Sequence, residues 1–472
     1  MIFIVSVSIS NIDSVYASTK TITSDDNLKT VVEDSLSVSK VATINLRSGT
    51  YDVSNKTITI KGDVTINGLD SGNSKPVLDA KNKNRIFVVS KGSTLTLKNL
   101  VITNGNTTGR GGAIHSEGNL VIENCVFSKN KIHGDWTGAG GAICSRYGTL
   151  SIKSSTFTQN KAQTGGGAIY SFESNVSVLK SYFNKNQASN GGAISYSNFL
   201  FRSNNKLVVS DSHFTENRAI REEFSFSGGA IHSSYGFLNI NNCIFTKNVA
   251  ADGGAIYSYY NKKVSIISST FKENSAIDGG GGAIYISSDS ATINKCTFIK
   301  NVVKGDSFGG GAICAGGSSL NIFNSLFSEN KATSHKSSRY QGGGAILAGT
   351  LKIDKSTFNK NTANFGGAIS TGVGSSSITR STFSKNTANN GSAIHGYGGN
   401  FKLVRHPSVL TVSKNVFSEN KGKYILYKHK TNPHKLYADN NFWGKNMNLK
   451  KVKSSCYGVN ISKLATSSKI RN

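Results

Sequence analysis

Short segments in which apolar and polar residues alternate recur along most of the chain. Gly-Gly-Ala-Ile recurs with its isoleucine at positions 114, 143, 169, 194, 231, 256, 284, 313, 346 and 369, and an eleventh copy reads Gly-Ser-Ala-Ile up to position 394. The motif Phe-x-x-Asn follows each copy, with its aromatic residue at Phe127, Phe157, Phe183, Phe214, Phe245, Phe271, Phe298, Phe327, Phe358, Phe383 and Phe417. A third segment, such as Leu150-Ser-Ile152, ends on an apolar residue five positions before each of these phenylalanines.

The alternation has a period of two residues, which predicts half-buried strands. One repeat therefore reads strand, loop, strand, fixed bend, strand, asparagine turn and loop. Successive copies are 23 to 37 residues apart, which suits one coil of a solenoid. In a solenoid the backbone hydrogen bonds of each coil are made with its neighbouring coils. The fold class that we predict is all-β, a right-handed parallel β-helix with three strands per coil. A β-propeller is the alternative, but a propeller blade needs about four strands per repeat, one more than the sequence pattern shows.

If equivalent residues of successive coils stack on one another, the repeat phenylalanines form one internal column and the repeat asparagines form another. The residues that we expect to build them include Phe127, Phe157, Phe183, Phe214, Phe245 and Phe271, together with Asn130, Asn160, Asn186 and Asn217.

The segments outside the regular repeats predict how the rod begins and ends. Residues 106–420 are the repeats, 41–105 carry irregular opening coils, and 421–472 form a closing coil and tail, giving about 14 coils. Leu28, Val31, Val32 and Leu36 fit one face of a helix within an N-terminal cap at 18–40. Residues 1–17 resemble a signal peptide cleaved after Ala17, which predicts export. The alternatives are a frayed hydrophobic terminus or a true start upstream of Met1.

The composition is strongly basic, and its charges are spread along the chain. The 472 residues carry 54 Lys+Arg against 26 Asp+Glu, a net charge of +28. Positive charge distributed in this way favours salt-sensitive binding to anionic envelope polymers or to cell-surface glycans or proteins. No nucleic-acid recognition motif is present, and no apolar run reaches the 18 residues that suggest a transmembrane helix. The oligomeric state cannot be inferred from the sequence.

One set of charges is ordered. The residue before each repeat asparagine alternates in sign over seven coils, as Lys185, Glu216, Lys247, Glu273, Lys300, Glu329 and Lys360. We call the column of residues at this position, from Lys129 to Glu419, the charge seam. It predicts attraction between neighbouring coils and a preference for one register, although chance sampling from a lysine-rich surface is an alternative.

The six cysteines do not indicate disulfides. Cys125, Cys243 and Cys296 take a position that serine fills in most other repeats, which predicts small packing residues. Cys243 and Cys296 are two repeats apart, about 10 Å, and disulfides need Cα separations below about 7 Å. Cys456 has no such explanation.

The alternation of Gly-Gly-Ala-Ile with Phe-x-x-Asn resembles the repeats of chlamydial polymorphic outer-membrane proteins. It is equally similar to adhesin-like β-helix proteins of methanogenic archaea, whose coil-ending motif resembles Asp439-Asn-Asn-Phe-Trp443-Gly444. The resemblance covers about residues 95–420. It implies an exported cell-surface or cell-envelope protein whose repeats mediate adhesion. The roughly 50 residues after position 420 are too few for an autotransporter barrel, so insertion into an outer membrane is in doubt.

An enzyme is the alternative, because β-helices also carry polysaccharide lyases and glycoside hydrolases. Asp252, Asp278 and Asp306 precede the glycine runs of three consecutive coils and could converge, yet turn aspartates commonly bond the local backbone. His115, His232 and His395 follow the repeat isoleucine in distant coils, and we expect them to be surface residues. We expect no catalytic site, metal or cofactor.

Long loops after the asparagine turn are the best candidates for binding. They span 131–139, 218–227, 302–309 and 331–342, all at the same edge of the predicted rod, and a further outgrowth at Asn198–Arg202 leaves from another turn. Aromatic and basic residues on such a rim suit a ligand surface, although neutral drift of tolerated loops is the alternative. The candidate binding residues are Trp136, Arg221, Phe224, Phe226, His335, Arg339 and Tyr340.

Overall fold

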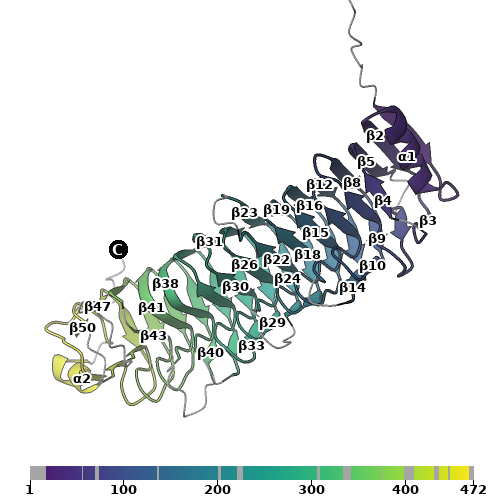
Figure 1. Cartoon of the computed structure of the whole chain (residues 1–472). Helices are drawn as coiled ribbons and strands as arrows, with labels where there is room; N and C mark the ends of the chain where they lie inside the picture. The colour runs from purple at the N-terminus through teal and green to yellow at the C-terminus, as the bar shows by residue number, and fades with distance from the viewer. Residues whose placement is uncertain are drawn as a thin grey trace, which may run out of the picture.

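The chain forms a parallel β-helix, an elongated rod along which the strands of successive coils lie side by side (Figure 1). The computed structural model describes residues 17–466, apart from 56, 70–73, 135–137, 200–203, 220–226, 306–308, 333–341, 373, 398–408, 430–434 and 445–446. Residues 1–16, and with them nearly all of the predicted signal peptide, lie outside the described part. Every strand pairing between coils is parallel, as the stacked repeats predict.

The first and second strands of the coils form one large sheet. The first strands are β4 (Ile58–Ile60), β7 (Phe87–Val89), β11 (Ile114–Ser116), β15 (Ile143–Arg146), β18 (Ile169–Phe172), β22 (Ile194–Ser197), β26 (Ile231–Ser234), β30 (Ile256–Tyr259), β34 (Ile284–Ser287), β43 (Ile369–Thr371), β46 (Ile394–Gly396), β49 (Leu426–Lys428) and β51 (Cys456–Tyr457). The second strands are β1 (Ser18–Ile22), β2 (Val41–Leu46), β5 (Asp63–Gly68), β8 (Thr94–Lys98), β12 (Asn119–Glu123), β16 (Thr149–Lys153), β19 (Asn175–Leu179), β23 (Lys206–Ser210), β27 (Phe237–Asn241), β31 (Lys263–Ile267), β35 (Ser290–Asn294), β44 (Ser376–Thr379), β47 (Val409–Ser413) and β50 (Lys435–Tyr437). Two long strands, β38 (Ile313–Phe323) and β41 (Ile346–Asp354), run through both positions.

The third strands form a separate sheet, with one strand from each of fourteen coils in the described residues. They are β3 (Thr50–Asp52), β6 (Val77–Asp79), β9 (Val101–Thr103), β13 (Val126–Ser128), β17 (Thr156–Thr158), β20 (Tyr182–Asn184), β24 (His213–Thr215), β28 (Ile244–Thr246), β32 (Thr270–Lys272), β36 (Thr297–Ile299), β39 (Leu326–Ser328), β42 (Thr357–Asn359), β45 (Thr382–Ser384) and β48 (Val416–Ser418).

The structure adds a fourth, two-residue strand after the asparagine turn of several coils. These strands are β10 (Asn106–Thr107), β14 (Lys131–Ile132), β21 (Gln187–Ala188), β25 (Arg218–Ala219), β29 (Val249–Ala250), β33 (Ser275–Ala276), β37 (Val302–Val303) and β40 (Lys331–Ala332). Two residues are too few to show the alternation that reveals a strand in sequence, so the segment was predicted only as loop.

The repeat phenylalanines stack in the middle of the rod. From Phe127 to Phe417 successive ring centroids lie 4.7–5.2 Å apart and nearly parallel. Trp443 extends the column at 4.5 Å from Phe417. These rings are buried, so each contributes its apolar area together with ring–ring contacts of about 0.5–1.5 kcal/mol per pair.

The repeat asparagines form a hydrogen-bonded column beside the rings. In a typical step, Oδ1 of Asn274 accepts from the backbone N–H and from Nδ2 of Asn248, each at 3.0 Å. Nδ2 of Asn274 donates to the carbonyl of Phe245 and to Oδ1 of Asn301. The same pattern runs from Asn130 to Asn420, which explains why the motif fixes Phe and Asn three residues apart.

The two paired glycines of the repeat are required for different structural reasons. The first glycine lies in the left-handed region, with φ +71° at Gly281. A Cβ on the second, Gly282, would overlap the carbonyl oxygen of the equivalent Gly311 in the next coil. Glycine is therefore required for the turn at one position and for the close approach of coils at the other.

The fixed five-residue step contains a left-handed residue followed by a serine or cysteine, except in the last repeat, where Asn415 follows Lys414. In one coil Ser154 has φ +50°, and Oγ of the next residue, Ser155, accepts from the backbone N–H of Cys125 at 3.1 Å. Cys125, Cys243 and Cys296 occupy this buried serine position. All six cysteines are free, as the spacing predicted.

Helices lie at the two ends of the rod (Figure 1). Helix α1 (Leu28–Val38) begins at Asn27, whose side chain accepts from the backbone N–H groups of Lys29 and Thr30, and it buries Leu28 and Val32. At the other end the short helix α2 (Leu449–Ser454) buries Val452.

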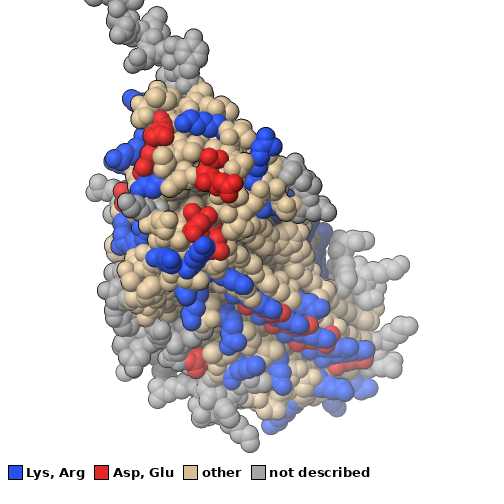
Figure 2. Space-filling model, turned by 90° about the vertical axis from the view of Figure 1, so that its right-hand side faces the viewer, with Lys and Arg blue, Asp and Glu red and all other residues tan. Residues whose placement is uncertain are grey.

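The charge seam lies along the outside of the turn between the third strand and the buried asparagine. Its residues all have φ between +52° and +57°, and this conformation turns the next residue, the asparagine, inward. Lysine and glutamate pair between neighbouring coils, at 3.7 Å for Lys185 with Glu216 and 4.0 Å for Lys247 with Glu273. Figure 2 shows blue and red side chains alternating in rows along one side of the rod.

Reversing one charge in the seam is expected to lower stability modestly. Glu273→Lys places three lysines in consecutive coils, and an exposed pair contributes about 0.2–1 kcal/mol. We expect a loss of about 1 kcal/mol at low salt that disappears in 1 M NaCl, measured by urea denaturation. Asp289→Lys, at an exposed position on another turn, makes the same charge change and serves as the control. Equal effects of the two variants would show that the seam has no role of its own.

Candidate binding surfaces

The long loops leave the rod from one edge. The first two residues of each of the four form a two-residue strand, β14, β25, β37 or β40, and each ends at the paired glycines. The last three strands belong to one sheet of hydrogen-bonded neighbours, and the glycine turns also bond from coil to coil, as Gly228 N–H does to the carbonyl of Asp252. The predicted rim residues Trp136, Arg221, Phe224, Phe226, His335, Arg339 and Tyr340 themselves lie outside the described residues.

A hollow of about 310 Å³ with mixed apolar and polar walls lies beside the first long loop. His133, Lys161, Gln163, Gln187 and Ser189 contribute to its lining. The ring of His133 is held by Asn106, whose Oδ1 lies 2.7 Å from Nδ1. The hollow offers amide, imidazole and ammonium groups, a set suited to hydrogen bonding with hydroxyls or anionic groups.

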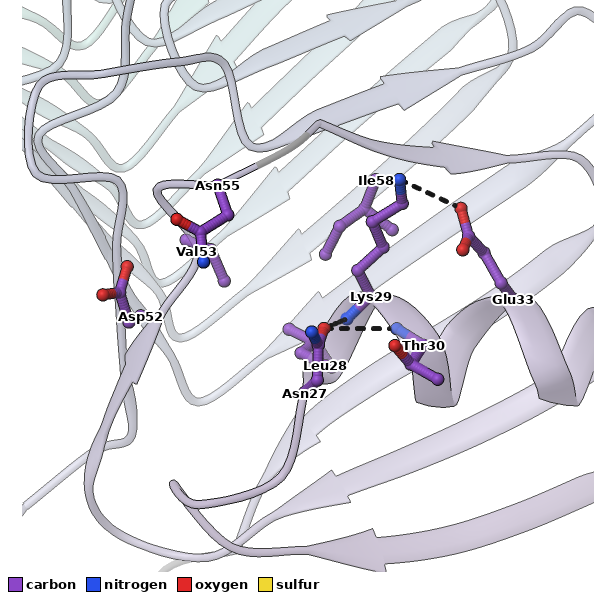
Figure 3. A pocket seen from close by; sticks show the side chains of 9 residues that line it. All are labelled: Asn27, Leu28, Lys29, Thr30, Glu33, Asp52, Val53, Asn55 and Ile58. Atoms are coloured by element: carbon purple, nitrogen blue, oxygen red, sulfur yellow. Dashed lines mark hydrogen bonds and ion pairs between the residues drawn. The ribbon is translucent and has the colours of Figure 1, made fainter.

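A second pocket, of about 280 Å³, lies between helix α1 and the opening coils (Figure 3). Its two carboxylates, Glu33 and Asp52, are each held by a lysine. Nζ of Lys29 lies 3.4 Å from Glu33, and Lys81 lies 2.6 Å from Asp52. The hydrogen bond from Lys81 holds the pKa of Asp52 well below its usual range, so this carboxylate is poorly suited to act as a general acid.

Asp252, the first residue of the predicted acidic group, is bonded into the glycine turns. Oδ1 of Asp252 accepts from the backbone N–H of Gly280 at 2.7 Å, and the backbone N–H of Asp252 donates to Oγ of Ser227. Asp306 lies outside the described residues, so the convergence of all three remains untested. Among the described residues no cluster of three histidine, cysteine or acidic side chains could hold a metal ion.

The prediction that the three histidines are surface residues was wrong. His395 is fully buried, His232 nearly so, and His115 half-buried. The reason is that two described loop residues, Ser227 and Phe365, lie against the rings of His232 and His395. The carbonyl of Ser227 lies 3.3 Å from Nδ1 of His232, and the ring of Phe365 lies 5.3 Å from that of His395.

Burial determines the charge state of these histidines and of the cysteines. Desolvation lowers the pKa of His232 to about 4 and that of His395 to about 3, so both rings are neutral at neutral pH. Desolvation raises the pKa of Cys144 to about 12. The thiol therefore stays protonated and is a poor nucleophile.

Only one part of a second exposed surface was recognised from the sequence, the outgrowth at Asn198–Arg202, of which residues 200–202 lie outside the described part of the chain. The turn between the first and second strands carries aromatic side chains in five successive coils, which we call the aromatic ridge: Tyr147, Phe172, Phe199, Tyr235, Tyr259 and Tyr260. The available signal was an aromatic residue three to five positions after the repeat isoleucine. It was overlooked because the offset varies between coils.

No helix in the described part of the chain is long and apolar enough to cross a membrane.

Comparison with known proteins supports the repeat and fixes its handedness. The profile of the "Right handed beta helix region" matches residues 85–271, and that of the "Chlamydia polymorphic membrane protein repeat" matches 268–287 and 355–372. The predicted resemblance to the chlamydial repeats is thereby confirmed. The similarity to archaeal adhesin-like proteins stays a prediction.

A curated protein shares a shorter stretch with this chain. The metabotropic glutamate receptor-like protein R of Dictyostelium discoideum is 35% identical over 117 residues. That stretch covers 25% of this chain and 7% of the receptor-like protein.

Proposed function

We propose that this right-handed β-helix, which carries polymorphic membrane protein repeats, is an exported, adhesin-like protein of the cell surface or envelope. It binds host or neighbouring-cell surfaces, through their glycans or proteins, by means of the rim loops and without catalysis. The observation that carries the proposal is that loops of very different length leave a uniform scaffold at one edge.

The contrast between scaffold and loops supports binding. The columns of Phe and Asn hold every coil in nearly the same geometry, with ring separations that vary by only half an ångström. Loops on such a scaffold can change length without disturbing the core, and this is how proteins commonly place recognition residues on rigid frameworks. The rim sequences add aromatic and basic residues, which are frequent anchors in interfaces.

The charge and the family similarity support a location at a surface. A net charge of +28 favours anionic polymers such as those of cell envelopes. The matching repeat is described as that of a chlamydial membrane protein. Lysines hold the carboxylates of Glu33 and Asp52, and a backbone N–H binds that of Asp252, which favours binding over hydrolysis.

Shortening two rim loops is expected to weaken binding at least tenfold with the fold retained. Deleting residues 221–226 leaves a connection as long as the one after Asn248, and deleting 335–340 leaves one as long as that after Asn274. Both lengths are therefore compatible with the coil. Binding of the purified chain to a glycan array and to intact cells measures the effect, with unchanged circular dichroism as the check on folding.

The salt dependence of binding distinguishes binding by the rim loops from non-specific attraction by the positive charge of the whole chain. Attraction by this charge alone should vanish at 0.5 M NaCl and be nearly unaffected by the deletions, which remove few charges. Binding that survives salt and is lost on deletion supports the proposal. Full retention after both deletions overturns it, and release of shortened glycan products would contradict the absence of catalysis.

A further inference from the structure

The residues of the aromatic ridge come from five successive coils whose strands are in register. Strand pairing places Arg146, Phe172, Ser197, Ser234 and Tyr259 in one row, so the turns that follow these residues lie next to one another. The rings contact each other in two groups: Tyr147 lies 5.8 Å from Phe172 in the first, and Phe199 lies 5.5 Å from Tyr235 in the second. Tyr235 continues to Tyr259 at 6.1 Å and to Tyr260 at 5.7 Å.

Folding alone gives little reason for these aromatic residues. Tyr147, Tyr235 and Tyr260 have φ of +64°, +64° and +46°, a region in which bulky side chains are strained. The rings of Tyr147 and Tyr260 are also more than half exposed. In a later coil the corresponding residues are Gly316 and Gly317, which lie in the long strand β38 and where a Cβ would meet nothing. Strained and exposed tyrosines at one turn of neighbouring coils indicate a role outside folding.

Basic side chains accompany the rings. Lys206, Phe237 and Lys263 align between neighbouring second strands, with both lysines exposed. Nζ of Lys262 lies 5.7 Å from the centre of the Phe237 ring. Of the acidic residues, Glu173 is buried and Glu117 lies 3.9 Å from Arg146. Asp289 is exposed in the coil after Tyr260, where its backbone N–H donates to the carbonyl of Asn261. The exposed charge beside the ridge is therefore mainly positive.

One end of the ridge is held in place before any ligand arrives. The guanidinium of Arg146 lies over the Tyr147 ring at 4.8 Å and over Phe172 at 5.4 Å. It also donates a hydrogen bond to the Tyr147 hydroxyl at 2.7 Å. Rings fixed in this way lose little conformational entropy on binding.

We propose that the aromatic ridge binds an extended acidic polysaccharide that lies along the rod. The apolar C–H faces of its pyranose rings pack on the aromatic rings, and its carboxylate or sulfate groups pair with Lys206, Lys262 and Lys263. Coils repeat at about 4.8 Å, close to the length of one pyranose unit, so successive sugars can meet successive rings. The site goes beyond the proposed rim function, because the ridge and the rim lie at opposite ends of the first strands.

The test uses the full chain and calorimetric titration with defined probes. The acidic probes are oligogalacturonate and heparin hexasaccharides, and the neutral control is cellohexaose. The variant combines Tyr147→Gly, Tyr235→Gly and Tyr260→Gly, and we expect at least a tenfold loss of affinity for an acidic probe. Its melting temperature should not fall, because glycine relieves the positive φ. Tyr182→Ala, at an equally exposed tyrosine of the third strands, should leave the affinity unchanged.

Further variants separate the parts of the proposal. Lys262→Gln with Lys263→Gln should weaken acidic probes alone, and the rim deletions should leave ridge binding intact, so the two proposals can fail independently. Absence of binding by both acidic probes, or unchanged affinity in the triple glycine variant, overturns the proposal. Equal binding of cellohexaose overturns its acidic part. A dimer abolished by the glycine variant, without glycan binding, would assign the ridge to a second copy of the chain.

Discussion

Replacement of Asn274 by alanine is expected to destabilise the rod by about 2–6 kcal/mol. The side-chain oxygen of Asn274 is the partner of two buried donors of Asn248, the backbone N–H and Nδ2. Leaving a buried donor unpaired costs about 1–3 kcal/mol. The loss falls in the middle of the column, where water cannot replace the missing acceptor, since Asn248 and Asn274 are fully buried.

Urea denaturation followed by circular dichroism measures the effect, and two further variants calibrate it. Asn241→Ala, at an exposed position of a neighbouring coil, should change stability by less than about 0.5 kcal/mol. Asn420→Ala should lie between the two, because Asn420 ends the column and is only partly buried. Three equal effects would contradict the view that burial of the asparagine column sets its energetic weight.

The fold was predictable because each repeat position has a single geometry. A left-handed glycine, a glycine touching the next backbone, a central phenylalanine and an asparagine that bonds between coils recur at fixed separations. Period-two alternation located three strands of each coil. The fourth strand was missed because its two residues carry no pattern, and its existence depends on pairing with the neighbouring coil.

The candidate sites were less predictable because they depend on what covers a strand. The alternation of apolar and polar residues correctly predicted that the residue after each repeat isoleucine points away from the core. It could not show that Ser227 and Phe365 would lie over His232 and His395. Similarly, the aromatic ridge becomes visible only when strand register places Arg146 beside Phe172. Motifs within a coil can be read from the sequence, whereas contacts between loops and neighbouring coils require the three-dimensional structure.

The buried histidines predict that the protein loses stability in mild acid. The pKa of His232 is lowered to about 4 and that of His395 to about 3, against an unfolded value of about 6.5. The unfolded chain therefore binds protons below pH 6.5 that the folded chain does not. Stability is complete above pH 6.5 and falls as the pH decreases toward 4, by up to about 3 kcal/mol for each histidine.

Tyrosine is the matched replacement, because the same position holds Tyr257 in the coil after His232 and Tyr427 in the coil after His395. The variant His232→Tyr with His395→Tyr removes these two titrating groups and keeps an aromatic side chain in each place. His115, whose pKa desolvation also lowers to about 4, is present in both proteins and leaves a smaller acid dependence in the variant. Urea midpoints between pH 7 and pH 4.5 should fall steeply in the natural chain and much less in the variant. This window lies above the ordinary pKa range of most carboxylates, so their protonation contributes little to the difference. Parallel curves for the two proteins would show that the rings become solvated or accept protons without unfolding, and would contradict their burial as the cause.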